Sequence, residues 1–447
     1  MFRLLAVYVV LLFSVSIAGA ETVKLSLKDA INLALENNNQ IKAAGFTSNA
    51  AWHGVAGANS RYFPVISFEE TFVASNSPVN TFMMKLDEGR YSPAEFSNAD
   101  SINNPSARHD FKTALTVQQP LFAPAIAPLK EMAAKDAQKS ELELESVRQS
   151  IAFQVFNTYL EVQKAIAWHK AAEIAVAEAR ENLRLATVRT ASGVGLRSDE
   201  LRSRTHLASV EQRQLAANNN LTLALMKLAL LLGFPDDKTF DISGFPDSIN
   251  VPAMSDRIVS EALMNRVEMR QSRTDVEKTA AAVKLAQSGY LPTAGAFASY
   301  QLNSKDTPVS PDNDSWTAGV TLKWNVFDGF RSSSERKRAL SGQSAAKEML
   351  ESTTKEVKYQ LRESYIRREE AAKRLEVVKY SVSDAEETVR LLMKRYENSL
   401  ATMSELLDAR TALNQARADL VESEAGYALA GGRVYYMTGT FLKEMQK

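Results

Sequence analysis

The sequence contains no cysteine. A chain without cysteine forms no disulfide and no thiolate metal site, and it has no cysteine near its N-terminus to carry an acyl anchor. Its 53 basic and 53 acidic residues balance, so the bulk charge indicates neither a nucleic acid nor another polyanion as partner. These absences exclude disulfide scaffolds and argue against nucleic-acid binding.

Catalytic signatures are also missing. The sequence has no P-loop, no dinucleotide-binding glycine motif and no nucleophile elbow. Its four histidines are far apart and do not occur at zinc-binding spacings, so we interpret them as ordinary surface or helix-face residues: His53, His109, His169 and His206. We therefore predict no catalytic residues, no metal site and no cofactor, and we do not expect an enzyme.

Long apolar runs are scarce. Residues 1–20 combine Arg3, a short apolar run and a small-residue exit at Ala20, which is the layout of a secretory signal peptide, so we expect the mature chain to begin at Glu21. No later segment has the roughly 18 uninterrupted apolar residues of a membrane-spanning helix. The longest candidate, residues 221–234, is interrupted by Lys227. We predict an exported protein without a transmembrane helix.

Glycine and proline are absent from residues 129–192. As a continuous helix this stretch would extend about 95 Å at 1.5 Å per residue, which no compact globular domain needs. Apolar positions recur along it at steps of four and seven, a pattern suited to packing against neighbouring helices. Glycines at 193 and 195 interrupt the pattern before a second helix, which ends at Leu232. The sequence predicts an antiparallel helical hairpin over residues 129–232.

The chain is a tandem repeat. The segment that begins at Leu115 (LTVQQPLF) aligns with the one that begins at Val320 (VTLKWNVF), an offset of 205, whereas Ala58 and its neighbours align with Ala286 at an offset of 228. Because the offset falls from 228 to 205, the first copy contains 23 more residues than the second between these two motifs. We assign these extra residues to a loop. We predict a signal peptide at 1–20, a first repeat at 21–233, a linker at 234–253 and a second repeat at 254–447.

Each repeat has the order helix, strand, strand and long helical hairpin. The predicted strands are 65–74, 111–119, 293–302 and 316–326, and the loops that join them in pairs are 76–110 and 303–314. The predicted helices outside the first hairpin are 26–60, 255–290, 331–397 and 402–430, of which the last two form the second hairpin, 331–430. We expect the last helix to end at Gly431 and Gly432.

Strand 316–326 alternates strictly. Apolar side chains fall on one face from Trp316 to Trp324, and polar or small ones fall on the other. Such a strand suits a membrane, with both tryptophans as membrane-interface aromatics, although a half-buried strand of a soluble sheet shows the same pattern. Because the segment occurs twice in the chain, we favour the membrane interpretation and expect contact with outer-membrane lipid.

Four strands per chain cannot close a membrane barrel, for which about eight is the smallest number. Open strand edges are not tolerated in lipid, so further copies of the chain must supply the missing strands. Twelve strands from three chains or sixteen from four would both close. Either barrel would enclose a pore, because its lumen is wider than that of an eight-stranded barrel. The predicted fold class is an α+β membrane protein in which the long hairpins continue this pore as a helical tube.

Five motifs in order at repeat spacing resemble those of TolC-type outer-membrane efflux proteins. They are the doubled Tyr-[Phe/Leu]-Pro strand entry, the doubled strand-Phe-turn-helix junction, the GVGL tip at 193–196, the SELLDA run at 404–409, and the Leu-Gly and Thr-Gly ends at 232–233 and 438–439. The resemblance implies a homotrimer with a twelve-stranded β-barrel and an α-helical barrel. It also implies a Gram-negative outer-membrane exit duct for efflux or type I secretion, opened by a periplasmic adaptor and an inner-membrane pump. Without an N-terminal cysteine, the chain departs from the lipidated branch.

The resemblance also implies functional positions near the hairpin turns. Glu405 and Asp408 match acidic positions that ring the periplasmic entrance, and Tyr396 matches a latch tyrosine, whereas Ala401 replaces the latch arginine. We hypothesise that the acidic pair sets ion selectivity, with counterparts in the first repeat at Asp199 and Glu200. The tips are expected to dock the adaptor through Gly193, Val194, Gly195, Leu196, Ser399 and Leu400.

A second hypothesis is a soluble periplasmic coiled-coil adaptor or scaffold. Such a protein would also contain long alanine-rich hairpins. It would have no use for alternating strands flanked by tryptophan, so the strands distinguish the two interpretations and favour the channel.

Overall fold

The structure is a computed structural model, and it describes residues 23–235, 240–242, 249–311 and 313–446. The predicted signal peptide lies outside the described residues. The chain is mostly helical with two small sheets, and it divides into two compact units. Unit 1 comprises residues 1–44, 144–267 and 354–447, and unit 2 comprises residues 45–143 and 268–353. Each unit therefore combines segments from both sequence repeats.

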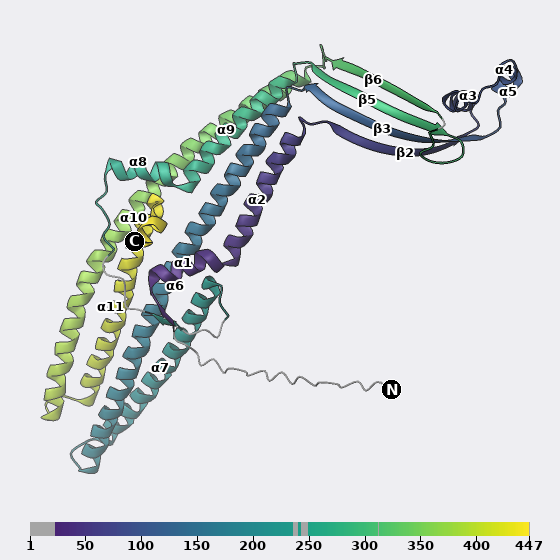
Figure 1. Ribbon diagram of the computed structural model, residues 1–447. Coiled ribbons are helices and arrows are strands. Elements are labelled where there is room, and N and C mark those ends of the chain that lie inside the picture. Colours follow the sequence, from purple (N-terminus) through teal and green to yellow (C-terminus); the bar gives the residue numbers. More distant parts are fainter. Residues whose placement is uncertain (1–22, 236–239, 243–248, 312, 447) are drawn as a thin grey trace, which may run out of the picture. The chain divides into compact units, whose positions relative to one another are not determined.

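The sheet of unit 2 contains the four predicted strands. Its order is β2-β3-β5-β6, and all neighbours are antiparallel (Figure 1). The bounds are β2 Val65–Ser75, β3 Arg108–Phe122, β5 Thr293–Ser304 and β6 Asp314–Lys323.

The register of this sheet gives it one apolar face. Phe68 pairs with Leu115, Leu115 with Tyr300, and Tyr300 with Trp316, so a row of large apolar side chains crosses all four strands. The predicted alternation is thus confirmed. The predicted end of the last strand was wrong: β6 ends at Lys323 rather than 326, so Trp324 lies beyond the strand, where its Nε1 donates to the Tyr290 carbonyl at 3.2 Å.

The predicted loop 76–110 is not free of regular structure. It holds three short helices, α3 Pro78–Asp87, α4 Pro93–Phe96 and α5 Ala99–Asn103, at the far end of the sheet, and β3 already begins at Arg108 (Figure 1). The ammonium of Lys85 pairs with Glu95, and the ring of Tyr91 packs against the rings of Phe82 and Phe96. The expectation failed because these helices are too short to show a period in sequence.

Two further predicted helices are each divided by one residue. Residues 26–60 form α1 Leu27–Asn37 and α2 Asn39–Ser60, and residues 255–290 form α8 Asp256–Asn265 and α9 Val267–Ser288. Extended backbone at Asn38 (ψ 126°) and Arg266 (ψ 132°) makes each break. Ser26 is the N-cap of α1, since its hydroxyl accepts from the Asp29 amide at 3.2 Å.

The long hairpins are α6 Ile126–Ala191 with α7 Arg197–Leu232, and α10 Arg331–Glu397 with α11 Met403–Thr438; the short α12, Phe441–Met445, follows. Of the helices that the structure describes, one, α7, is long and apolar enough to cross a membrane when judged by length and composition alone. Lys227 of α7 nevertheless pairs with Glu161 of α6 at 2.9 Å, an ion pair between the two helices of the hairpin.

The expectation that the last helix ends at Gly431 and Gly432 was wrong, because α11 continues to Thr438. A Cβ at Gly432 would lie 2.2 Å from the ring of Phe156, and one at Gly431 would lie 3.2 Å from Ile249. These glycines allow close packing rather than ending the helix. The helix ends at Gly439, whose φ of 72° is left-handed.

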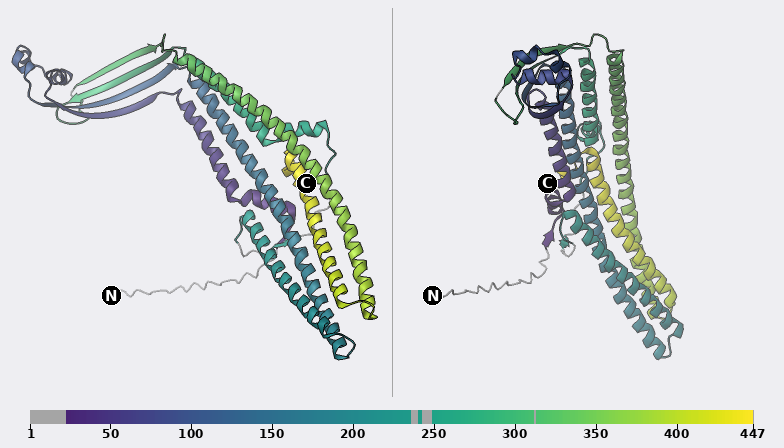
Figure 2. Two further views of the ribbon diagram at one scale, coloured as in Figure 1. Left: turned by 180° about the vertical axis from the view of Figure 1, so that it is seen from behind. Right: turned by 90° about the vertical axis from the view of Figure 1, so that its right-hand side faces the viewer.

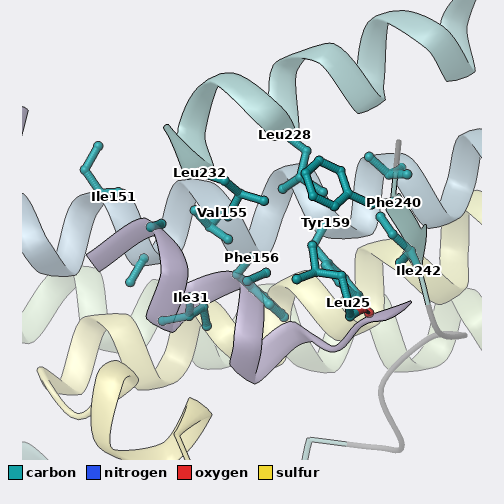
Figure 3. Packing of buried hydrophobic residues seen from close by; sticks show 14 of the residues in the cluster. Leu25, Ile31, Ile151, Val155, Phe156, Tyr159, Leu228, Leu232, Phe240 and Ile242 are labelled. Carbon is teal, nitrogen blue, oxygen red and sulfur yellow. Dashed lines mark hydrogen bonds between the residues drawn. The ribbon is translucent and has the colours of Figure 1, made fainter. Parts of the chain in front are cut away.

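The main core of unit 1 lies where α1, α6 and α7 meet a two-stranded sheet (Figure 3). In this sheet β1 Val23–Leu25 pairs in parallel with β4 Phe240–Ile242, which lies in the predicted linker. Phe156 and Tyr159 of α6 are almost completely buried, and the Tyr159 hydroxyl donates to the Leu25 carbonyl at 3.0 Å. Strand β1 is therefore anchored to the middle of α6.

Candidate functional site

The turns of both hairpins lie at one end of unit 1, where the hairpins run side by side (Figure 1, Figure 2). In the first turn, Gly193 has a φ of 76°. Gly195 approaches the end of α6 so closely that a Cβ would lie 2.8 Å from the carbonyl carbon of Arg189. Both glycines are therefore required by the backbone, whereas the neighbouring Val194 and Leu196 side chains are 70% and 67% exposed.

The second turn begins α11 with a capping box. The carboxylate of Glu405 accepts from the amide of Thr402 at 2.7 Å and from its hydroxyl at 2.9 Å. These hydrogen bonds, that from the backbone amide first, hold the pKa of Glu405 below its ordinary value. The carboxylate that the sequence hypothesis assigned to ion selectivity is thus engaged in starting a helix.

A small apolar core lies directly beneath the two turns. It consists of Ala186 from α6, Tyr396 from α10, and Met403, Leu406 and Leu407 from α11. Tyr396 is 5% exposed, and burial is the main cause that raises the pKa of its phenol. The predicted latch tyrosine is therefore a core residue that joins the tips of the two hairpins.

Arg189, in the last turn of α6, makes the polar contacts between the tips. Its Nη2 donates to the hydroxyl of Ser399 at 2.9 Å, and its Nη1 donates to the carbonyl of Tyr396 at 3.4 Å. Its guanidinium also lies 4.9 Å from the centroid of the Tyr396 ring. Although Ala401 stands at the position of the latch arginine, Tyr396 still contacts an arginine, because the first hairpin supplies Arg189.

Sequence reasoning missed Arg189. Its contact with Tyr396 spans 207 residues, so no local spacing pointed to it. The available signal was weak: a basic residue in the last turn of a helix, which interacts favourably with the helix dipole and is common at such ends.

The other predicted carboxylates differ in their surroundings. Glu200 is 5% exposed and pairs with the guanidinium groups of Arg197 and Arg204, the latter at 2.9 Å. Asp408 is exposed and Asp199 is half-buried, and neither makes an ion pair within the part of the chain that the structure describes. A ring of carboxylates at the entrance would therefore depend on the two aspartates more than on the two glutamates.

Deeper in the hairpins, a cationic cluster joins three helices. Arg410 of α11 pairs with Glu178 of α6 at 2.6 Å. His206 of α7 is half-buried, and burial, followed by Arg213 and Arg410, lowers the pKa of its imidazole. Burial therefore favours the neutral form of this imidazole. Among the described residues, no group of three or more potential ligands could hold a metal ion.

Known proteins are similar to this chain in sequence. The family model described as "Outer membrane efflux protein" matches residues 30–234 and 258–440. The chain is 20% identical to the proteases secretion protein PrtF of Dickeya chrysanthemi over 97% of this chain and 92% of that protein. It is also 20% identical to the outer membrane protein TolC of Salmonella enteritidis, over 96% of this chain and 85% of that protein.

Solved structures show the same fold. The Campylobacter jejuni CmeC outer membrane channel superposes with a TM-score of 0.77 at 18% identity, over 93% of this chain and 86% of that one. CusC superposes with a TM-score of 0.79 at 16% identity, over 94% and 93% of the two chains.

The chain belongs to the outer membrane efflux protein family. The prediction of a TolC-type protein is confirmed, and the channel is supported over the soluble adaptor or scaffold. Its location is the outer membrane, and the family is one of channel proteins rather than enzymes.

Proposed function

We propose that three copies of this chain form a passive exit duct through the outer membrane, without catalysis of its own, in a tripartite efflux or type I secretion system of a Gram-negative bacterium. The observation that carries the proposal is the sheet of unit 2. Within the described residues, β2 and β6 each have one unpaired edge, and the sheet has an apolar face. In lipid such edges must pair, and three copies supply the twelve strands of a closed barrel.

The helices of unit 1 support association of copies. α7 and α10 each expose a stripe of large apolar side chains along one helix face in the single chain. The stripe on α7 consists of Leu201, Leu215, Leu223, Met226 and Leu230, and that on α10 consists of Tyr359, Ile366, Val377 and Tyr380. In the proposed trimer each stripe is buried against a neighbouring chain, which also explains why α7 is apolar without crossing a membrane.

The oligomer mass tests the assembly. Three copies of the 49.3 kDa chain, each less its signal peptide, give roughly 140 kDa for protein extracted from outer membranes with detergent, as measured by mass photometry. A monomer recovered from the soluble periplasm would refute the proposal.

The exposed turns are proposed to dock a periplasmic adaptor, which links the duct to an inner-membrane pump. Val194, Leu196 and Leu400 are 70%, 67% and 68% exposed at the tips, although no fold requirement keeps them apolar. Leu196→Asp should abolish export while the trimer mass and the surface level of the protein stay unchanged. Normal export by this variant would count against docking at the tip.

Ion selectivity is proposed to reside in the aspartates of the entrance. Two carboxylates about 7 Å apart in water repel by only about 0.6 kcal/mol, but a ring of them favours cations. In planar bilayers, Asp408→Asn should lower the cation-to-anion permeability ratio more than Glu405→Gln does, because Glu405 is engaged in its capping box. Equal ratios in wild type and Asp408→Asn would show that Asp408 is only part of a solvated helix face.

A further inference from the structure

The segment that follows β6 carries an exposed pair of aromatic rings. Phe327 and Phe330 are 73% and 71% exposed, and their ring centroids lie 5.4 Å apart at 89°. Val326 beside them is 80% exposed. All three follow within seven residues of Lys323, where β6 ends. The rings contact each other but are largely uncovered, so the single chain leaves an apolar patch at the base of a membrane strand.

The backbone at Phe330 makes the patch more unusual. Phe330 has a φ of 64°, directly after Gly329 with a φ of 68°. Bulky L-residues rarely adopt this left-handed conformation, which a glycine would adopt without strain. An aromatic residue at this position gains little from packing within its own chain. Its use is therefore expected to lie in a contact outside the chain.

Basic residues follow immediately. Arg331, Arg336, Lys337 and Arg338 are exposed on the first turns of α10. Arg338 pairs with Glu335 at 3.0 Å, whereas Arg336 and Lys337 make no ion pair within the described residues. The Asp328 carboxylate is already engaged, since it accepts from the Ser332 amide at 2.8 Å. Two cations are thus left without a carboxylate next to the aromatic pair.

The basic residues lie close to the rings along the axis of α10. Lys337 lies seven residues after Phe330 and six residues after Arg331, where α10 begins, so it is about 9 Å along the axis from that start. Side chains on a helix lean toward its N-terminus, and long basic side chains extend along apolar surface with their charges in water. This distance is similar to the depth of a head-group layer.

We propose that residues 326–338 bind an anionic phospholipid of the membrane leaflet that borders the helices. The two rings lie at the boundary of the acyl chains, where aromatic side chains are favoured, and Arg336 and Lys337 pair with the head-group phosphate. The corresponding turn of the first repeat keeps one exposed ring, Phe122 at 48% exposure, but it has Ala125 at the position of Phe330 and so lacks the second ring. Its nearby Lys130 is held by the Asn59 side chain at 2.8 Å, so each chain has one such site.

The charge contribution can be tested on the detergent-solubilised full-length oligomer by native mass spectrometry with phosphatidylglycerol, phosphatidylcholine or inorganic phosphate. Loss of two charges in Arg336→Gln/Lys337→Gln should weaken phosphatidylglycerol binding roughly thirtyfold and leave phosphatidylcholine binding unchanged. The matched control, Lys347→Gln/Lys355→Gln, removes the same charge from exposed positions further along α10 and should bind as the wild type does. An equal loss in both pairs, or displacement of the lipid by millimolar phosphate, would overturn the assignment.

Phe330→Gly separates the lipid site from an alternative occupant, a second copy of the chain. The substitution relieves backbone strain, so the oligomer in lipid-free detergent should be at least as heat-stable as the wild type, while phosphatidylglycerol binding weakens. If instead the variant trimer dissociates more readily and lipid binding is unchanged, the ring is a contact between copies and the lipid assignment is wrong.

Discussion

Replacing Arg189 with alanine should favour the open state of the entrance. In the structure, this one side chain contacts the second hairpin through Ser399, the Tyr396 carbonyl and the Tyr396 ring. We propose that the entrance widens when the hairpin tips move apart, a movement that these contacts oppose. The variant keeps the small apolar core beneath the tips, since Arg189 is not part of it.

The size of the effect follows from the contacts. A hydrogen bond from a charged group contributes about 1.5 kcal/mol at the low end, and the partly exposed setting of Arg189 reduces this toward about 1 kcal/mol. A cation–π contact at an exposed site adds about 0.5 kcal/mol. The sum of about 1.5 kcal/mol shifts an opening equilibrium roughly tenfold per chain. In a trimer that opens in a concerted way, the shift multiplies to roughly a thousandfold.

Single-channel recording in planar bilayers measures this shift as open probability and conductance. Ser399→Ala removes one acceptor and keeps the ring contact, so its effect should be smaller. Arg184→Ala is the control, because Arg184 lies on the same helix and, among the described residues, its ion pair is with Glu181 of that helix. Arg189→Ala channels that stay as closed as those of the wild type would refute the idea that Arg189 holds the tips together.

Three further predictions concern packing, topology and pH. Gly432→Ala should destabilise the fold by about 1–3 kcal/mol in chemical unfolding, because its Cβ would overlap the buried Phe156 ring, whereas Gly426→Ala in the same helix meets nothing within 4 Å and should be neutral or stabilising. The connection between β2 and β3 is expected to face the cell exterior, because it joins the strands at the end of the sheet away from the helices, so an epitope tag at Asn98 should bind antibody on intact cells; binding only after permeabilisation would show that this connection faces the periplasm. Since folding lowers the pKa of Glu405, its capping box contributes stability above the ordinary value of 4.5 and loses it as the pH falls through the lowered value. The protection factors for hydrogen exchange at the start of α11, which correct for the intrinsic pH dependence of exchange, should therefore fall in acid, and less so in Glu405→Gln; identical pH profiles of protection would contradict the role of the carboxylate.

Much of the architecture could be predicted from the sequence, because the patterns that encode it are local. At most ends of the hairpin helices, the predicted and observed boundaries differ by only a few residues. Long stretches without glycine or proline have few alternatives to a helix. The strands followed from alternation. Counting them led to the prediction that further copies of the chain are needed, which stays a prediction. The short helices α3 to α5 were not predictable, because too few residues carry their pattern.

The tertiary structure decided the features that depend on distant residues. In the sequence, Gly432 is the kind of residue that ends a helix. In the structure, the Phe156 ring lies beside it and shows that the glycine is there for close packing. The parallel pairing of Val23 with Phe240 leaves no local trace, because three-residue strands have no period of their own. Arg189 likewise became part of the candidate site only when folding brought it to Tyr396. The sequence by itself determined the elements, since their hydrogen bonds and apolar faces are set by nearby residues. Which side chains meet at the entrance depended on long-range packing.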